Sequence, residues 1–232
     1  MNKAIVIATI RPWHIDNAQR LQQTWAKERP VFLITDPKEL TVSQLQEWNP
    51  QYVFFPHWSW KIPASIHEQF ECVLFHMTDL PYGRGGSPLQ NLIQRKIYHT
   101  KISAIKVVRQ LDAGPIYLKR DLYLGLGSAE EIFITMSEII FFDMIPYIIQ
   151  HHPQPIPQSG DPVTFQRRNP AQSLLPTHEM HSLRDLYDFI RMLDAEGYPP
   201  AYLEWNGFRF TFSNAHLRHN HLEGHFKVTQ TP

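Results

Sequence analysis

The sequence of 232 residues contains one cysteine, Cys72, so no disulfide can form within the chain. A chain of this length with 43% hydrophobic residues can bury a core that needs neither disulfide nor metal for stability. The first residues also lack the pattern of a secretory signal peptide. These absences predict a reducing, cytoplasmic location.

An excess of charge and a long apolar run are also absent. The 22 Lys and Arg residues balance the 22 Asp and Glu residues, so bulk charge does not indicate a nucleic-acid or anionic-membrane partner. The most apolar stretch, residues 139–149, is too short to span a bilayer and contains Asp143 and Pro146. We expect it to form a buried helix.

Alternating apolar and amphipathic segments predict an α/β fold. Strands are predicted at residues 3–10, 31–35, 51–56 and 72–76, and helices at residues 15–28 and 41–48. This order is typical of a doubly wound, mostly parallel, Rossmann-like sheet. No G-x-G-x-x-G follows the first strand, so a dinucleotide cofactor is not expected.

A proline-rich break suggests two domains. Before it, residues 101–124 predict two strands joined by a Leu-Asp-Ala-Gly-Pro turn, and a helix is predicted from residue 128 to about residue 150. The break at residues 151–162 separates a predicted catalytic domain, 1–150, from a small C-terminal module, 151–232.

The C-terminal module predicts a helix followed by a hairpin. Residues 182–197 have helical apolar spacing, with Ser182 as the N-cap, and the Asn206-Gly207 pair is typical of a tight hairpin turn. Beyond it lie four histidines whose spacing fits no familiar metal site, at positions 216, 219, 221 and 225. We interpret this end as a polar tail and expect no metal.

His76 and Asp112 each end a predicted strand. Ligands of parallel α/β sheets bind outside the carboxyl ends of the strands, so we expect both side chains in one crevice. A carboxylate orients a histidine for proton transfer and for stabilising negative charge, although such pairs are also common as structural contacts. Cys72, inside an apolar strand, is predicted to belong to the core.

A glycine-rich turn at residues 83–86 lies between these two residues in the sequence and leads into a helix start. Glycines allow the backbone to approach a ligand closely. Ser87, Pro88 and Gln90 have the pattern of an N-cap, a first helical position and a capping box. The free N–H groups of that helix start would favour an anion.

The runs FHMTDLPYGRGGSPLQNLI (75–93) and IKVVRQLDAGPIYLK (105–119) resemble the 10-formyltetrahydrofolate-dependent formyltransferases. The resemblance covers roughly residues 50–125. It implies that His76 and Asp112 are catalytic, that 10-formyltetrahydrofolate is the cosubstrate, and that no metal is needed. His76 would stabilise the tetrahedral oxyanion, and Asp112 would orient His76.

The same resemblance implies the binding residues. Those predicted for the folate are Trp58, Ser59, Trp60, Lys61, Ile62, Thr78, Leu80 and Pro81. Those predicted for the acceptor are Arg84, Gly85, Gly86, Ser87 and Asn91. Trp58 and Trp60 could instead simply cover the core. The chain has Leu74 where the family has an oxyanion-binding asparagine, so Thr78, Asn91 or a backbone N–H of the glycine turn would have to replace that donor.

The C-terminal module predicts the acceptor. Its EGYPPAYLEWNG run (196–207) resembles sugar N-formyltransferases, and its 7 Lys and Arg against 8 Asp and Glu give tRNA a poor surface. The run at residues 75–93 is similar to the sugar N-formyltransferases of pseudaminic acid pathways. We therefore expect formylation of an amino sugar, nucleotide-linked, in surface polysaccharide biosynthesis, without a nucleic-acid or membrane partner and with a homodimer left open. The alternatives are a methionyl-tRNA or other formyltransferase, a formyltetrahydrofolate hydrolase, and a degenerate folate- or sugar-binding protein.

Overall fold

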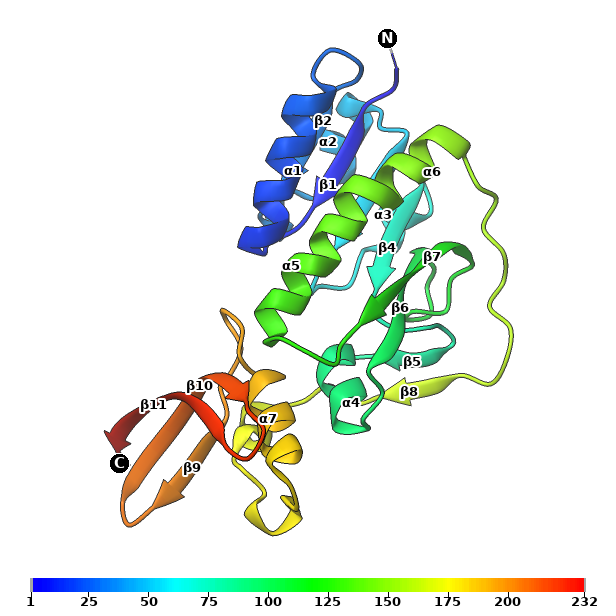
Figure 1. Ribbon diagram of the computed structural model, residues 1–232. Helices are drawn as coiled ribbons and strands as arrows, with labels where there is room; N and C mark the ends of the chain where they lie inside the picture. The colour runs from blue at the N-terminus through cyan, green and yellow to red at the C-terminus, as the bar shows by residue number, and fades with distance from the viewer. Residues whose placement is uncertain (1, 232) are drawn as a thin grey trace. The chain divides into compact units, whose positions relative to one another are not determined.

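The computed structural model describes residues 2–231, which group into two compact units (Figure 1). Unit 1 contains Met1–Gly85, Thr100–Leu122 and Ile134–Thr164, and unit 2 contains Gly86–His99, Tyr123–Phe133 and Phe165–Pro232. Because the chain passes between the units several times, they do not follow the predicted boundary at residue 150. That residues 1–150 and 151–232 are separate domains stays a prediction.

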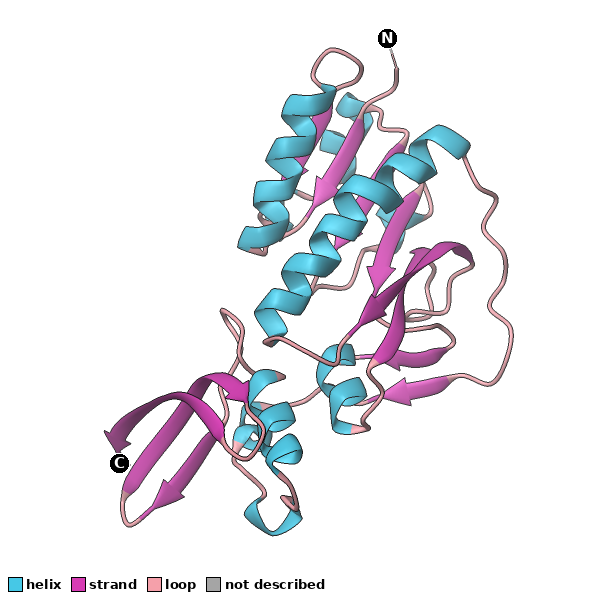
Figure 2. Ribbon diagram, in the orientation of Figure 1, coloured by secondary structure: helices cyan, strands magenta, loops and turns pink. Residues whose placement is uncertain are grey.

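Unit 1 is built on a six-stranded sheet with the order β2-β1-β3-β4-β6-β7 (Figure 2). Its strands are β1 (Ile5–Ala8), β2 (Val31–Ile34), β3 (Tyr52–Pro56), β4 (Cys72–His76), β6 (His99–Lys106) and β7 (Ile116–Tyr123). The pairs β1–β2, β1–β3 and β3–β4 are parallel, and β4–β6 is antiparallel. The predicted mostly parallel α/β sheet is therefore confirmed.

Buried apolar strands and capped helices explain this arrangement. All four residues of β1 are 0% exposed, as expected for a central strand covered on both faces. Helix α2 (Val42–Trp48) begins as predicted, because the Thr41 hydroxyl accepts a hydrogen bond from the N–H of Gln44. Helix α1 (Pro12–Trp25) begins three residues earlier than predicted, because Pro12 suits the first helical position. The shorter helical segments are η1 (Pro37–Glu39) and α3 (Ala64–His67).

The apolar stretch around residue 145 lies in a long, largely buried helix. It consists of α5 (Ala129–Ile139), a π-helical turn η2 (Ile140–Met144) and α6 (Ile145–His151). Pro146 cannot donate a backbone hydrogen bond, and the wider π turn directly before it accommodates this loss. By length and composition the segment could cross a membrane, but 56% of its most apolar window is buried in the fold. This agrees with the predicted core helix.

Unit 2 contains short helices and a three-stranded antiparallel sheet. Its elements include α4 (Pro88–Gln94), η3 (Pro170–Ser173), η4 (Thr177–Glu179), α7 (Leu183–Arg191), β9 (Tyr202–Trp205), β10 (Phe208–Leu217) and β11 (Leu222–Gln230). The predicted hairpin is confirmed, since Asn206 and Gly207 have φ values of 46° and 78° between β9 and β10. The predicted polar tail is wrong, because residues 222–230 gain a full ladder of hydrogen bonds by pairing with β10.

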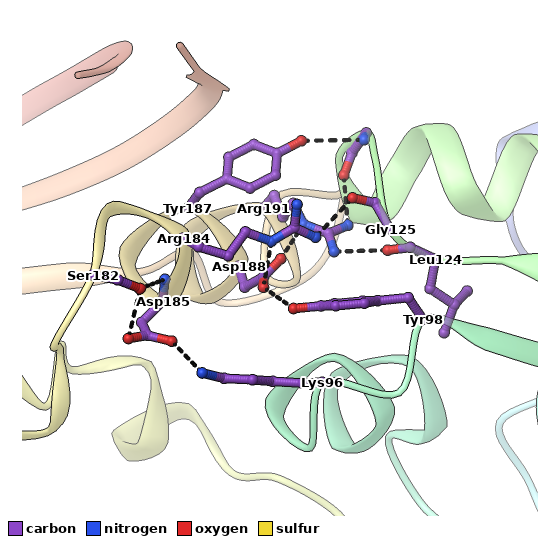
Figure 3. Close-up of polar contacts among 11 residues, drawn as sticks. Lys96, Tyr98, Leu124, Gly125, Ser182, Arg184, Asp185, Tyr187, Asp188 and Arg191 are labelled. Atoms are coloured by element: carbon purple, nitrogen blue, oxygen red, sulfur yellow. Dashed lines mark hydrogen bonds and ion pairs between the residues drawn. The ribbon is translucent and has the colours of Figure 1, made fainter. Parts of the chain in front are cut away.

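A buried ion network holds α7 against the loop at residues 124–127 (Figure 3). Arg191, whose side chain is 1% exposed, donates to Asp188 at 2.7 Å and to two carbonyl oxygens of this loop. Asp188 also accepts from Arg184 at 2.9 Å and from the Tyr98 hydroxyl at 2.6 Å. Because removing one partner would leave a buried charge uncompensated, we expect this network to fix the loop firmly.

Candidate active site

The structure brings together the two predicted catalytic residues. His76 is the last residue of β4 and is 7% exposed, and Asp112, in the turn between β6 and β7, is 6% exposed. The Nδ1 atom of His76 lies 3.7 Å from the Oδ2 atom of Asp112. The pair therefore lies at the carboxyl end of a parallel strand, where ligands of such sheets bind.

The backbone around Asp112 fixes its carboxylate. Asp112 has a left-handed φ of 50°, and its Oδ2 accepts a hydrogen bond from the N–H of Gly85 at 2.8 Å. A Cβ atom at Gly114 would lie 1.7 Å from the carbonyl oxygen of Lys106, so only glycine fits there. The Asp-x-Gly spacing thus has a steric cause that is independent of chemistry.

The second nitrogen of His76 is also engaged. Its Nε2 donates to the carbonyl oxygen of Gly83 at 2.8 Å, and the Thr78 hydroxyl donates to the same oxygen at 3.4 Å. Gly83 belongs to a short strand, β5 (Tyr82–Gly85), which pairs with β8 (Val163–Phe165), so the predicted simple turn is a strand. Both ring nitrogens of His76 therefore face acceptor oxygens.

Gln158 is a site residue that the sequence analysis missed. Its Nε2 donates to the carbonyl oxygens of Asp112 and Gly114 at 2.8 and 2.9 Å, and its Oε1 accepts from the Arg84 guanidinium at 2.7 and 3.1 Å. One amide thus connects the Asp112 turn to Arg84. Because Gln158 lies in the proline-rich segment interpreted as a break, no spacing or periodicity indicated this role.

Leu74 precedes His76 by two residues, so both side chains lie on the same face of β4. Leu74 packs against the apolar core and cannot donate a hydrogen bond. The predicted substitutes are already engaged. The Thr78 hydroxyl binds Gly83, and the side-chain N–H groups of Asn91 bind three carbonyl oxygens within unit 2. Among the backbone N–H groups of the glycine turn, that of Gly85 binds Asp112 and that of Gly86 binds the carbonyl oxygen of Phe165.

The predicted capping box at the start of α4 is wrong. Ser87 has a left-handed φ of 51°, and its hydroxyl accepts a hydrogen bond from the N–H of Arg168 rather than from its own helix. Gln90 donates to the carbonyl oxygen of Met192 instead of reaching back to Ser87. Gly86 packs against Arg167, since a Cβ atom there would lie 2.6 Å from the Cβ of Arg167. These contacts all lie within unit 2. Acceptor binding by Arg84, Gly85, Gly86, Ser87 and Asn91 stays a prediction.

The predicted folate residues divide by exposure. Ile62 and Leu80 are buried in the core, and Thr78 is fully buried. Trp58 is half-buried against the core, and its ring lies 5.1 Å from that of Trp60. The more accessible members are Ser59, Trp60, Lys61 and Pro81, of which Trp60 is 47% exposed. Folate binding by this group stays a prediction.

A second polar cluster lies where β1 and β3 end, and the sequence analysis did not single it out. His14, in α1, is fully buried, and its Nδ1 lies 2.8 Å from the hydroxyl of Ser137. The His57 ring, just after β3, lies 5.7 Å from that of His14. Burial, aided by the charge of Arg11, lowers the pKa of His57 to about 3 and holds the pKa of His14 well below its usual value. Both rings are therefore neutral near pH 7.

The described residues were also searched for side chains that could bind a metal ion or act as a nucleophile. Within residues 2–231, no three His, Cys, Asp or Glu side chains gather in an arrangement that could hold an ion. Cys72 is buried, and burial raises the pKa of its thiol to about 12, which keeps it protonated. That His76 and Asp112 are the catalytic pair stays a prediction.

Comparisons with known proteins indicate the family to which the chain belongs. The chain is 47% identical to methionyl-tRNA formyltransferase from Clostridium thermocellum, with a TM-score of 0.95 over 99% of this chain and 100% of that one. It is 28% identical over 147 residues to methionyl-tRNA formyltransferase from Bacillus pumilus, a match of 60% of this chain and 44% of the relative. The chain spans about half the length of the curated relatives it matches. A sugar N-formyltransferase from Shewanella, with 15% identity, a TM-score of 0.66 and coverage of 88% and 93%, shows a shared fold.

The comparisons contradict the predicted acceptor. Residues 170–229 match the family described as methionyl-tRNA formyltransferase, C-terminal domain, although their sequence was predicted to indicate a sugar-modifying enzyme. The interpretations as a pseudaminic-type amino-sugar enzyme and as a protein without a nucleic-acid partner are therefore wrong. The predicted class, a formyltransferase using 10-formyltetrahydrofolate, agrees with the matches. The chain therefore belongs to the formyltransferase family in which these methionyl-tRNA formyltransferases are found.

Proposed function

We propose that the protein transfers a formyl group from 10-formyltetrahydrofolate to the amino group of methionyl-tRNA. The observation that carries this proposal is the His76–Asp112 pair at the carboxyl end of β4, in a chain 47% identical over its full length to a methionyl-tRNA formyltransferase. No other pair of titratable side chains in the described part of unit 1 combines this burial with a position beside a glycine-rich strand.

In the proposed reaction, the amine nitrogen attacks the formyl carbon, and a C–N bond forms while the carbonyl oxygen becomes an oxyanion. The bond from this carbon to N10 of the folate then breaks, N10 takes up a proton, and the amine loses one. Asp112 accepts the amine proton through a water, and His76 donates an N–H to the oxyanion. An oxyanion donor of this kind contributes about 3–4 kcal/mol to transition-state stabilisation.

In the proposed mechanism, the hydrogen bond from His76 to Gly83 must break first. The Nε2–H of His76 is held by the Gly83 carbonyl at 2.8 Å, so it must leave this acceptor before it can reach an oxyanion. The positive φ values of Gly83 and Gly85, 81° and 103°, belong to glycine-favoured conformations of the strand that carries this carbonyl. A small shift of β5 would release the histidine when substrate binds.

The balanced charge of the C-terminal residues predicts how tRNA binding responds to salt. Residues 151–232 carry 7 Lys and Arg against 8 Asp and Glu, so they offer little to neutralise tRNA phosphates. We place the reacting amino group at His76 in unit 1 and expect tRNA binding to depend only weakly on salt, because few counterions would be released.

The proposal is tested by supplying 10-formyltetrahydrofolate with one acceptor at a time: methionyl-tRNA, glycinamide ribonucleotide, a nucleotide-linked amino sugar, or buffer alone. We expect release of tetrahydrofolate with methionyl-tRNA, and recovery of formylmethionine after deacylation. Faster release with another acceptor would overturn the tRNA assignment, and equal release in buffer would identify a hydrolase. The Asp112→Asn variant, which keeps the shape of the side chain, provides the inactive control.

A further inference from the structure

The loop after β3 reaches the face of the sheet on which Leu74 and His76 lie. Phe55 of β3 is opposite Leu74 in the parallel register, so their side chains share this face. The Trp58 ring lies 5.8 Å from the Phe55 ring, in an edge-to-face orientation. Trp58, Phe55 and Leu74 also belong to one hydrophobic cluster. Trp58 therefore lies beside the carboxyl end of β3, on the side of the sheet that carries His76.

The indole N–H of Trp58 is a buried donor without a partner. Within residues 2–231 its Nε1 atom forms no hydrogen bond, although a buried tryptophan N–H usually finds an acceptor. The hydroxyl of Thr78 and the amide of Asn91, in contrast, already donate to carbonyl oxygens. An indole N–H donates and cannot accept, so the group that pairs with it must present an acceptor such as an oxygen.

Trp58 lies close to solvent, although its N–H group is shielded. It belongs to the irregular segment 57–63 between β3 and α3. The Trp60 ring of the same segment is 47% exposed and lies 5.1 Å from the Trp58 ring. A donor that is held in place and shielded from water stabilises a developing negative charge more strongly than a solvated donor does.

We propose that the indole N–H of Trp58 donates a hydrogen bond to the formyl oxygen, in place of the side-chain amide that Leu74 lacks. This role rests on the proposed formyl transfer. As the amine nitrogen bonds to the formyl carbon, the π electrons of the C=O bond move to the oxygen, which accepts hydrogen bonds from Trp58 and His76. Neighbouring strands lie about 4.8 Å apart, so side chains at the ends of β3 and β4 can reach one atom. Trp58 keeps its proton throughout.

Trp58→Phe tests this role, because phenylalanine keeps an aromatic ring beside Phe55 but has no N–H. We expect kcat for formyl transfer to fall about 100-fold, while KM for 10-formyltetrahydrofolate changes less than about threefold. Trp60→Phe is the matched control, since it makes the same substitution in the same segment at an exposed ring. Its kcat should stay within about threefold of the wild-type value.

A restored donor should rescue the variant. Leu74→Asn places an amide on the face of β4 that carries His76. Added to Trp58→Phe, it should raise kcat at least about tenfold over Trp58→Phe alone. A loss caused by poor packing of the phenylalanine would not respond to this amide. Circular dichroism and thermal unfolding check that each variant folds.

The indole proton gives a second measurement, which needs no formyl acceptor. The chain has six tryptophans, and the indole signal of Trp58 in a proton–nitrogen correlation spectrum is the one that Trp58→Phe removes. With 10-formyltetrahydrofolate this signal should move to higher proton frequency, because the proton enters a hydrogen bond. Tetrahydrofolate lacks the formyl oxygen and should not produce this shift.

The role of Trp58 would be refuted if Trp58→Phe kept kcat within about threefold of the wild-type value. Equal losses in Trp58→Phe and Trp60→Phe with a raised KM would instead indicate packing against the folate. Equal shifts of the indole signal with both folates would place its hydrogen bond away from the formyl oxygen. Failure of the proposed function has a different signature: the wild type would not formylate methionyl-tRNA, yet the indole signal would still distinguish the two folates.

Discussion

Gln158 donates its side-chain amide to the carbonyl oxygen of Asp112 at 2.8 Å, and so supports the turn that holds the predicted catalytic carboxylate. The same side chain accepts a hydrogen bond from Arg84 at 2.7 Å. The Asp112 turn, strand β5 and the proline-rich segment after α6 therefore meet at one amide. Disturbing this amide should move the carboxylate relative to His76 without removing any group that we propose to react.

We expect Gln158→Glu to lower kcat about 10- to 100-fold while changing KM for the folate much less. The glutamate keeps an acceptor for Arg84 but loses both donations to the carbonyl oxygens of the Asp112 turn, and small misplacements of reacting groups are costly. Steady-state kinetics, with Gln154→Glu in the exposed part of the same segment as the control, checks this. Equal losses in both variants would refute a positioning role.

The fold was largely predictable from the sequence, because the central strands are continuous apolar runs and the caps at Thr41 and Ser182 use short-range side-chain hydrogen bonds. Strand β11 was not predictable, because its polar and apolar residues do not alternate regularly. Its stability comes from pairing with β10. The capping box at Ser87 also failed. A tertiary contact with Arg168 uses the hydroxyl that the local pattern assigned to the helix.

Only those residues of the candidate site that belong to a short sequence motif could be predicted. His76 and Asp112 were found from strand ends and from the family resemblance, and the structure places them 3.7 Å apart. Gln158, His14 and His57 were missed, since each reaches its partners through long-range packing. The acceptor was predicted wrongly, because the balanced charge of residues 151–232 was taken to exclude tRNA.

We expect His76→Ala and Asp112→Asn to reduce formyl transfer by at least 1,000-fold, since each removes a group from the proposed proton and charge path. Thermal unfolding should show both variants folded. The exposed His219→Ala serves as the control and should keep wild-type turnover. Turnover above about a tenth of the wild-type value in either site variant would refute the assignment.

Gly114→Ala should destabilise unit 1 by about 2–4 kcal/mol, because the new Cβ atom would lie 1.7 Å from the carbonyl oxygen of Lys106 and the backbone of the turn would have to move. Urea unfolding measures the loss. The neighbouring Ala113→Gly tests whether any change in this turn has the same effect, and it should lower stability by less than about 1 kcal/mol. A stable Gly114→Ala variant would show that the turn adapts easily.

The pKa of His57 predicts a loss of stability in mild acid. Burial holds this pKa at about 3 in the folded protein, whereas an unfolded histidine has a pKa near 6.5. As the pH falls below about 6.5, His57 is therefore protonated in the unfolded state but stays neutral in the folded state. The stabilisation is fully present above that pH and is lost progressively down to about pH 3.

For one such histidine, the linkage removes about 2 kcal/mol between about pH 7.5 and pH 5, or roughly 4–8 °C in Tm for a chain of this size. His57→Asn cannot titrate and accepts the left-handed φ of 54° at this position, so its Tm should fall less over the same range. For the control variant His219→Asn, at an exposed position, Tm should depend on pH as it does in the wild type. If Tm fell equally with pH in the wild type and in His57→Asn, His57 would not be held neutral by its surroundings.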